Sequence, residues 1–196
     1  MTTGTTPKGE RRRQALVEAA ADLLVERGFD AVRHRAVAER AGLPLASTTY
    51  YFDSLDELIT AAVEHHARIE LDRGRANLVE LASRHRGLDT LIELVLDQLL
   101  GAEPKSGGDA EAVLLRYERL VATGRRPYLR PLMRALAVEM YELLSEIFAK
   151  SGMPVTKERL ERVVALVDGA VVNALIEIHS DPRATARRML RAVLTE

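Results

Sequence analysis

The chain has 196 residues, of which 47% are hydrophobic and 29% charged, with a net charge of −1 and no cysteine. This composition supplies enough apolar surface for a core, excludes disulfides and thiolate metal sites, and argues against a protein that coats nucleic acid indiscriminately. Residues 1–13 are basic and lack the apolar run of a signal peptide, so we expect a cytoplasmic protein. No stretch approaches the ~20 apolar residues of a membrane-spanning helix, so we expect no membrane partner.

Helical periodicity covers almost the whole chain, and the alternating pattern of strands is absent. Gly28 and Gly42 end the first two helices, and Ser54 with Glu57 has the spacing of a capping box at the start of the fourth. Residues 101–108 are rich in glycine and contain a proline, so we expect a flexible linker there. The fold class is therefore all-α, and we expect nine helices, over residues 14–27, 33–41, 44–51, 54–83, 87–100, 109–122, 127–150, 158–179 and 182–194.

The segment 36–52 has the layout of a helix-turn-helix, in which a short helix, a tight turn and a second short helix follow one another. Val37 and Leu43 provide the apolar contact between the two helices, and Ala38 is small where they cross. Gly42 provides the left-handed backbone that the turn requires. Because the second helix of such a unit can enter a DNA major groove, this segment is the candidate nucleic-acid interface.

Polar side chains are placed on this unit where DNA would pass. The second short helix presents hydroxyl groups, which can donate to phosphate oxygens or approach a thymine methyl group. These hydroxyl-bearing residues are Ser47, Thr49, Tyr50 and Tyr51. The first short helix begins with Arg33, His34 and Arg35, close to the expected sugar-phosphate backbone. Backbone N–H groups at that helix start also favour an anion.

The segment from Gly28 to Leu58 resembles the DNA-binding domain of TetR-family transcriptional regulators. The motifs that carry the resemblance are Gly28-Phe29, Val37-Ala38, Ala41-Gly42-Leu43, Tyr50-Tyr51-Phe52, and Ser54 with Glu57-Leu58. The resemblance implies a flexible basic arm over residues 1–9, a helix-turn-helix domain over 10–53 and a helical effector-binding and dimerisation domain over 54–196. It also implies a homodimer that represses transcription from a (pseudo)palindromic DNA operator and is released by an unknown small molecule.

The resemblance also implies individual roles. Tyr50 and Tyr51 contact phosphates at the end of the recognition helix, and Phe52 anchors that helix in the core. The groove-facing residues are Pro44, Leu45, Ala46, Ser47 and Thr49. Leu55 stands where the family often has a phosphate-binding lysine, so we expect phosphate contacts from Arg33, Arg35 and the N-terminal arm instead.

The helix expected over 158–179 is apolar around most of its circumference, so it must be covered on two sides. One side can face the core of the chain and the other a second subunit, although a central helix in a monomer would show the same pattern. The residues that we expect at a dimer interface are Val164, Val167, Val171, Ala174, Leu175, Ile178 and Met189.

A small-molecule pocket is implied by the resemblance, but no motif locates it. Large adaptable side chains and polar groups among the body helices are the candidates, although ordinary core packing explains them equally well. These candidates are His66, Tyr117, Met133, Met140, Tyr141, Asp168 and Asn173. We expect no cofactor and no metal, because His65 and His66 are adjacent and point about 100° apart on a helix.

Two other classes of function are weighed against a DNA-binding regulator. An enzyme is disfavoured because the chain has no nucleophile elbow, phosphate-binding loop, dinucleotide fingerprint or His-Glu-x-x-His motif. A helical interaction module without specific DNA binding remains the alternative, because Arg33, Thr48 and Leu55 depart from the family pattern.

Overall fold

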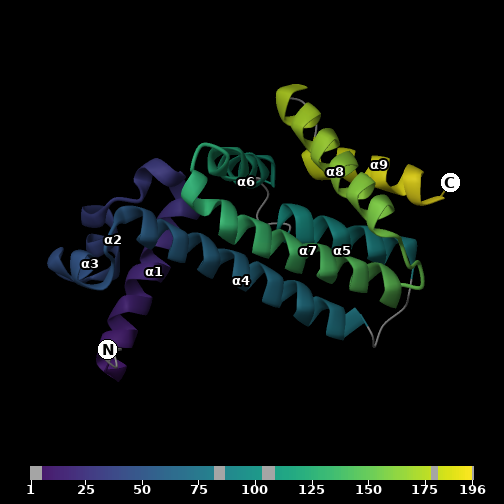
Figure 1. The fold of residues 1–196 in the computed structure, drawn as a ribbon. Coiled ribbons are helices and arrows are strands. Elements are labelled where there is room, and N and C mark those ends of the chain that lie inside the picture. The colour runs from purple at the N-terminus through teal and green to yellow at the C-terminus, as the bar shows by residue number, and fades with distance from the viewer. Residues whose placement is uncertain (1–5, 82–86, 103–108, 178–180, 196) are drawn as a thin grey trace. The chain divides into compact units, whose positions relative to one another are not determined.

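The computed structural model describes residues 6–81, 87–102, 109–177 and 181–195. Within these ranges all regular structure is helical, in nine α-helices and two short 3-10 helices (Figure 1). The all-α fold expected from the periodicity is therefore confirmed. The expected helix ends at Ser83 and His179 lie outside the described residues, as does most of the linker expected over 101–108.

The helices follow one another in the expected order. They are α1 (Pro7–Arg27), η1 (Phe29–Ala31), α2 (His34–Ala41), α3 (Ala46–Tyr51), α4 (Leu55–Leu81), α5 (Leu88–Leu100), α6 (Asp109–Thr123), η2 (Pro127–Leu129), α7 (Arg130–Lys150), α8 (Lys157–Glu177) and α9 (Pro182–Thr195). Differences from the sequence-based expectation lie at the helix ends. α3 begins at Ala46 rather than Pro44, and α1 begins well before residue 14.

The early start of α1 corrects part of the expected flexible arm. The side chain of Thr6 caps the helix by accepting the N–H of Gly9 at 3.2 Å. Pro7 occupies the first turn, where its missing N–H is not needed. Residues 7–9 are therefore helical, and Lys8 stands on a defined first turn, whereas residues 1–5 lie outside the described residues.

Packing divides the chain into two compact units. We call residues 1–68 together with 117–133 the N-terminal unit, and residues 69–116 together with 134–196 the C-terminal unit. The helices α4, α6 and α7 each contribute residues to both units. The predicted domains, divided after residues 9 and 53, concern roles rather than packing, and they stay a prediction.

An apolar core holds the N-terminal unit together. Leu16, Ala20 and Leu24 of α1 are one helical turn apart and all buried, so they form one apolar stripe. Val37 of α2 and Phe52, which directly follows α3, are buried in the same cluster. Because they share this cluster, α2 and α3 are fixed against α1.

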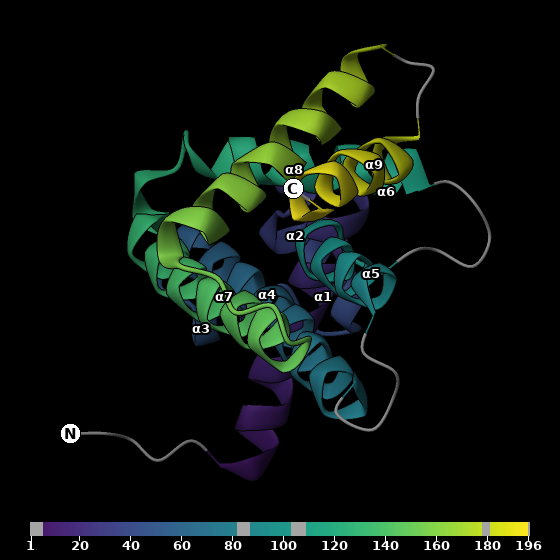
Figure 2. The same cartoon turned by 90° about the vertical axis from the view of Figure 1, so that its right-hand side faces the viewer.

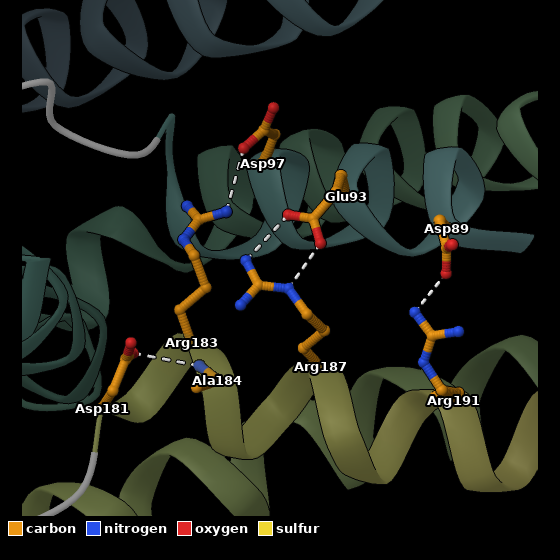
Figure 3. A network of polar contacts seen from close by, with 8 residues as sticks. All are labelled: Asp89, Glu93, Asp97, Asp181, Arg183, Ala184, Arg187 and Arg191. Atoms are coloured by element: carbon orange, nitrogen blue, oxygen red, sulfur yellow. Dashed lines mark hydrogen bonds and ion pairs between the residues drawn. The ribbon is translucent and has the colours of Figure 1, made fainter.

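The C-terminal unit contains a ladder of ion pairs. Its α9 packs against both α8 and α5 (Figure 2). Three arginines at intervals of four residues on α9 face three carboxylates with the same spacing on α5 (Figure 3). The pairs of this α5–α9 ladder are Arg183 with Asp97, Arg187 with Glu93, and Arg191 with Asp89. Because the numbering runs in opposite directions, the ladder sets the register of two antiparallel helices.

The first pair of the ladder is the most buried. The side chain of Arg183 is 1% exposed, and its Nη1 donates to Asp97 Oδ1 at 3.0 Å. Its Nη2 donates to the carbonyl of Gly101, at the end of α5, where a cation is favoured by the helix dipole. Asp181 caps α9 by accepting the N–H of Ala184 at 3.0 Å. Arg183 thus joins the start of α9 to the end of α5.

Gly74 lies in the middle of α4 because neighbouring helices approach it closely. A Cβ at this position would overlap the side chain of Gln98 on α5 and come within 2.7 Å of Leu143 Cδ2 on α7. The sequence identifies Gly74 only as a possible helix breaker. In the structure α4 continues through it, and the glycine serves helix packing.

Candidate nucleic-acid interface

The turn between α2 and α3 has the geometry expected of a helix-turn-helix. Gly42 has φ of 65° and ψ of 31°, in the left-handed region that glycine adopts easily. The N–H of Leu43 donates to the carbonyl of Ala38 at 3.0 Å, which closes the end of α2. Val37 and Ala38 are buried, as their predicted contact roles require.

One side of α3 is anchored in the core. The side chain of Thr48 is fully buried, and its hydroxyl donates to the carbonyl of Leu45 at 2.8 Å. The buried hydroxyl is thereby satisfied within the helix. Phe52 is buried directly after the last turn, which confirms its predicted anchoring role. These two contacts determine which residues of α3 face outward.

The opposite side of α3 is open to solvent. Tyr50 is 80% exposed, and its ring meets the ring of Tyr51 edge to face, with centroids 4.8 Å apart. Thr49 is exposed and its hydroxyl donates to the carbonyl of Ala46 at 3.3 Å. It can therefore accept a hydrogen bond from a base as it stands, but it must rotate before it can donate one. Of the seven residues that we expect to touch DNA from this region, Pro44, Leu45, Ala46, Thr49 and Tyr50 are exposed, and Ser47 and Tyr51 are half-buried.

The basic residues at the start of α2 differ in their availability for a phosphate. Arg33 is the N-cap residue without a side-chain cap bond, and its Nε donates to the Asp30 carbonyl at 3.0 Å. His34 is half-buried. The side chain of Arg35 is 82% exposed and lies 3.6 Å from Glu39, a solvent-exposed pair of the kind that contributes little to stability. Arg35 can therefore exchange its partner for a phosphate at small cost.

An ion pair that the sequence did not reveal holds α2 on α1. Arg40 donates from Nη1 and Nη2 to the two carboxylate oxygens of Glu26, at 2.9 and 2.6 Å. This fork geometry orients the two helices as well as attracting them. The hydrogen bonds from Arg40 lower the pKa of Glu26. The partners are 14 positions apart, outside the spacing that pairs residues within one helix.

The predicted capping box at the start of α4 is present in a shifted form. The N–H of Glu57 donates to Ser54 Oγ at 3.1 Å. The Glu57 carboxylate accepts the N–H of Asp53, at 2.7 Å, rather than that of Ser54. Leu55, which replaces the family's frequent lysine, is half-buried. The box therefore fixes the chain directly after the outward face of α3.

The residues expected to form a ligand pocket are not gathered in one unit. His66, Tyr117 and Met133 belong to the N-terminal unit, and the other four belong to the C-terminal unit. Asn173 is exposed. Tyr141 and Asp168 are half-buried, and burial together with the carboxylates of Glu161 and Asp168 raises the pKa of Tyr141. The charge of Asp168 thus acts on Tyr141, and both belong to the seven expected residues.

A small cavity in the C-terminal unit contains none of these seven residues. Its volume of about 10 Å³ suits roughly one water molecule. The lining comes from α4, α5 and α7. The residues are Glu70, Arg73, Gly74, Asn77, Leu94, Asp97, Gln98 and Ile147. Sequence patterns did not indicate them, because they are brought together by the close packing around Gly74.

The expected dimer residues lie mostly on the inner side of α8. Val164, Val167, Val171 and Ala174 are buried within the single chain, so they have little surface to offer a partner. Leu175 is half-buried, Met189 is 39% exposed, and Ile178 lies outside the described residues. The outward side carries Val172, 41% exposed, and Ile176, 70% exposed. The helix is apolar on two sides as expected, but its inner side is the one first assigned to the partner.

Two classes of site find no support among the described residues. None of the groups of histidine and acidic side chains there is arranged to hold a metal ion. No helix in the described ranges is both long and apolar enough to cross a bilayer.

Comparison with known families matches both parts of the chain. Residues 16–62 match the family described as "Bacterial regulatory proteins, tetR family". Residues 86–196, more than half of the chain, match the family described as "Tetracyclin repressor-like, C-terminal domain". The first match contains α2, α3 and their turn, and the second contains α5 to α9.

Individual proteins give the same result. The HTH-type transcriptional regulator PksA of Bacillus subtilis (strain 168) is 26% identical over 170 residues, covering 86% of this chain and 80% of PksA. The multidrug binding protein EbrR, complexed with ethidium, is 30% identical with a TM-score of 0.65, covering 95% of this chain and 98% of that one. A TetR family member, SCO1917 from Streptomyces coelicolor A3, is 31% identical with a TM-score of 0.61, covering 92% and 96%.

Proposed function

Because this chain belongs to the TetR family of transcriptional regulators, we propose that it binds a (pseudo)palindromic operator as a homodimer and is released by a small molecule. We propose that the DNA-bound protein represses transcription and that it acts in the cytoplasm. Members of the family are DNA-binding transcription factors and not enzymes. The observation that carries the proposal is the exposed outer face of α3, held in place by buried Thr48 and Phe52.

The exposed face of α3 has the chemistry of a major-groove surface. Leu45 and Ala46 offer apolar contact to a thymine methyl group. The Thr49 hydroxyl can accept a hydrogen bond from a base edge, or donate one after rotating. Tyr50 stands at the end of the helix, where its exposed hydroxyl can reach a phosphate. Arg35 supplies a charged phosphate contact from α2. Base contacts and phosphate contacts would thus come from different residues.

The outward side of α8 supports a homodimer. Val172 and Ile176 on α8 and Met189 on α9 are exposed apolar side chains in the same unit. Ala165 and Gly169 on α8 are exposed and small, which would allow a second helix to approach closely. Two subunits joined here would present two α3 helices, and half-sites about one helical turn of DNA apart would match them.

The class of effector is proposed from a relative. EbrR is described in complex with ethidium, an aromatic cation. In this chain Tyr141 and Asp168 are both half-buried in the C-terminal unit, and the Asp168 carboxylate helps to raise the pKa of Tyr141. A ring and a carboxylate of this kind would suit such a cation. Fluorescence titration of ethidium with the protein alone, without DNA, tests this. We expect saturable binding that weakens in Asp168→Asn, and equal binding by the variant would remove Asp168 from the site.

The DNA-binding proposal is tested by selecting duplexes from a random library with the full chain. We expect an enriched motif with two-fold symmetry. Tyr50→Ala should weaken binding to all sequences by about threefold to tenfold, the worth of one hydrogen bond. Thr49→Ala should instead change the preferred base at one position of each half-site.

The two variants control for each other, because they are neighbours on one exposed helix. If Thr49→Ala leaves the preferred sequence unchanged, the proposed orientation of α3 is wrong. If no sequence is enriched by the unmodified protein, the protein is a helical interaction module rather than a sequence-specific regulator.

A further inference from the structure

We infer that Arg126 and Arg119, far along the chain from α3, are positioning residues that hold the helix-turn-helix in its DNA-binding geometry. The inference rests on the proposed DNA binding. Both residues lie in the segment 117–133, which packs as part of the N-terminal unit. This segment lies outside residues 16–62, the range matched by the N-terminal family. The functional DNA-binding unit would therefore be discontinuous in sequence.

The segment is anchored in the core of the N-terminal unit. Leu129 of η2 is fully buried in the same apolar cluster as Phe29 and Phe52. Ala122 and Met133, on either side of η2, pack against this cluster. The segment is thus held before, within and after η2, which fixes the backbone from which Arg126 extends.

The guanidinium group of Arg126 stacks on the Phe29 ring of η1. Its guanidinium carbon lies 3.9 Å from the centre of the Phe29 ring, a close cation–π contact. Nη1 donates to the Ala122 carbonyl at 2.9 Å, and Nη2 lies 3.9 Å from Asp30 Oδ1. The side chain is only 24% exposed, so these contacts are partly shielded from water. A single arginine therefore connects the end of α6 with two consecutive residues of η1.

Arg119 holds the end of α1, immediately before η1. Its Nη1 donates to the carbonyl of Val25 at 3.1 Å. Val25 is in the last turn of α1, where carbonyls lack complete helical partners and a positive charge is favoured. Arg119 and Arg126 thus hold the two sides of the bend at Gly28, which has φ of 76°.

The position of η1 determines where α2 begins. The Asp30 carbonyl accepts a hydrogen bond from Arg33 Nε at 3.0 Å, and Arg33 is the N-cap residue of α2. Val32, between them, is buried and gives the connection little freedom. A shift of η1 would therefore move the start of α2, and α3 with it. Arg126 would control DNA binding without touching DNA.

Operator affinity of the full chain tests the inference, with the duplex selected above as the probe. Arg126→Gln removes the cation over Phe29, and we expect affinity to fall by roughly threefold to tenfold. Arg126→Lys, which keeps a cation over the ring, should recover most of the loss. In a protein that already carries Phe29→Leu, Arg126→Gln should have no further effect, because the ring that the cation contacts is gone. The double variant should therefore bind the operator with the same affinity as Phe29→Leu alone.

Arg125→Gln is the matched control, because Arg125 is the exposed neighbour with the same charge. It should bind the operator like the unmodified protein. The salt dependence adds a second readout, since loss of a phosphate contact lowers its slope by about 1, whereas loss of a positioning residue leaves it unchanged. A residue that only stabilises the fold would lower the melting temperature and leave affinity well below melting unchanged.

Three results would overturn the inference. Unchanged affinity in Arg126→Gln, with operator binding intact in the unmodified protein, would show that the contact only stabilises the fold. A lower salt slope would make Arg126 a phosphate contact. Equal losses in Arg125→Gln and Arg126→Gln would reduce the effect to net charge. Failure of the unmodified protein to bind any operator would instead overturn the proposed function, and the inference with it.

Discussion

The two units of this chain differ in the interactions that stabilise each of them internally. The N-terminal unit is built around an apolar cluster formed by α1, α2 and the residues after α3, with ion pairs such as Arg40–Glu26 near its surface. The C-terminal unit also has apolar helices, but α9 is joined to α5 by three consecutive arginine–carboxylate pairs. Apolar contact fixes the candidate interface, whereas α9 combines buried Ala186, Leu190 and Leu194 with the charged ladder to α5.

The ladder is graded by burial, and burial decides what each pair contributes. The side chain of Arg183 is 1% exposed, whereas that of Arg191 is 47% exposed. A buried arginine that loses its carboxylate keeps an uncompensated charge, but an exposed one is rehydrated. Ion pairs with equal spacing in the sequence therefore contribute unequally to the free energy of unfolding. The following changes test this contrast between the units, beginning with the largest expected effect.

Asp97→Ala should give the largest loss of stability. The variant removes the carboxylate that accepts the Nη1 hydrogen bond of buried Arg183, so we expect the free energy of unfolding to fall by about 3 kcal/mol. Urea denaturation followed by circular dichroism measures this. Replacing both members, as Asp97→Leu with Arg183→Leu, should recover most of the loss. Stability unchanged in Asp97→Ala would mean that the pair does not hold α9.

Gly74→Ala should also destabilise the C-terminal unit, although alanine is the better helix former. The added methyl group meets the side chains of Gln98 and Leu143, and overpacking costs about 1–3 kcal/mol against a gain of ~1 kcal/mol in helix propensity, so we expect a net loss of up to about 2 kcal/mol. Thermal melts measure this loss, and a stabilising Gly74→Ala would refute the close packing around Gly74.

Ser54→Ala tests the N-terminal unit at the cap of α4. Loss of the hydroxyl that accepts the Glu57 N–H should cost about 1 kcal/mol. Ser54→Asp keeps an acceptor at this position and should retain stability. Urea denaturation distinguishes the two variants, and equal stability in both would show that the capping bond contributes nothing.

Arg191→Ala should have the smallest effect. Both partners of this pair are largely exposed, so we expect a loss below about 0.5 kcal/mol that disappears in high salt. The comparison with Asp97→Ala shows how the stability contributed by an ion pair changes from the buried to the exposed end of the α5–α9 ladder. A loss at Arg191 as large as that at Asp97 would contradict the role assigned to burial.

Local sequence signals were sufficient for much of the candidate site. Gly42 indicated the turn, Ser54 and Glu57 indicated the cap, and Phe52 indicated the anchor, because each depends on neighbours within a few positions. The helix order followed from periodicity for the same reason. The start of α1 was missed because its signal, Thr6 with Pro7, lies before the apolar stripe.

Long-range packing explains what the sequence could not provide. Val167 and Val171 were assigned to a partner because periodicity identifies two apolar sides of α8 without saying which faces the core. The expected pocket residues come from both units, and their role stays a prediction because residue type carries no information on location. The contact of Arg126 with Phe29 joins positions that no local spacing relates.

The central claim is that the outer face of α3 recognises a particular DNA sequence. Fluorescence anisotropy of the full chain at physiological salt, with the selected duplex and a scrambled duplex of the same composition, tests it most directly. We expect the selected duplex to bind at least about 10³-fold more tightly than the scrambled one. Equal affinity for both duplexes would contradict the claim.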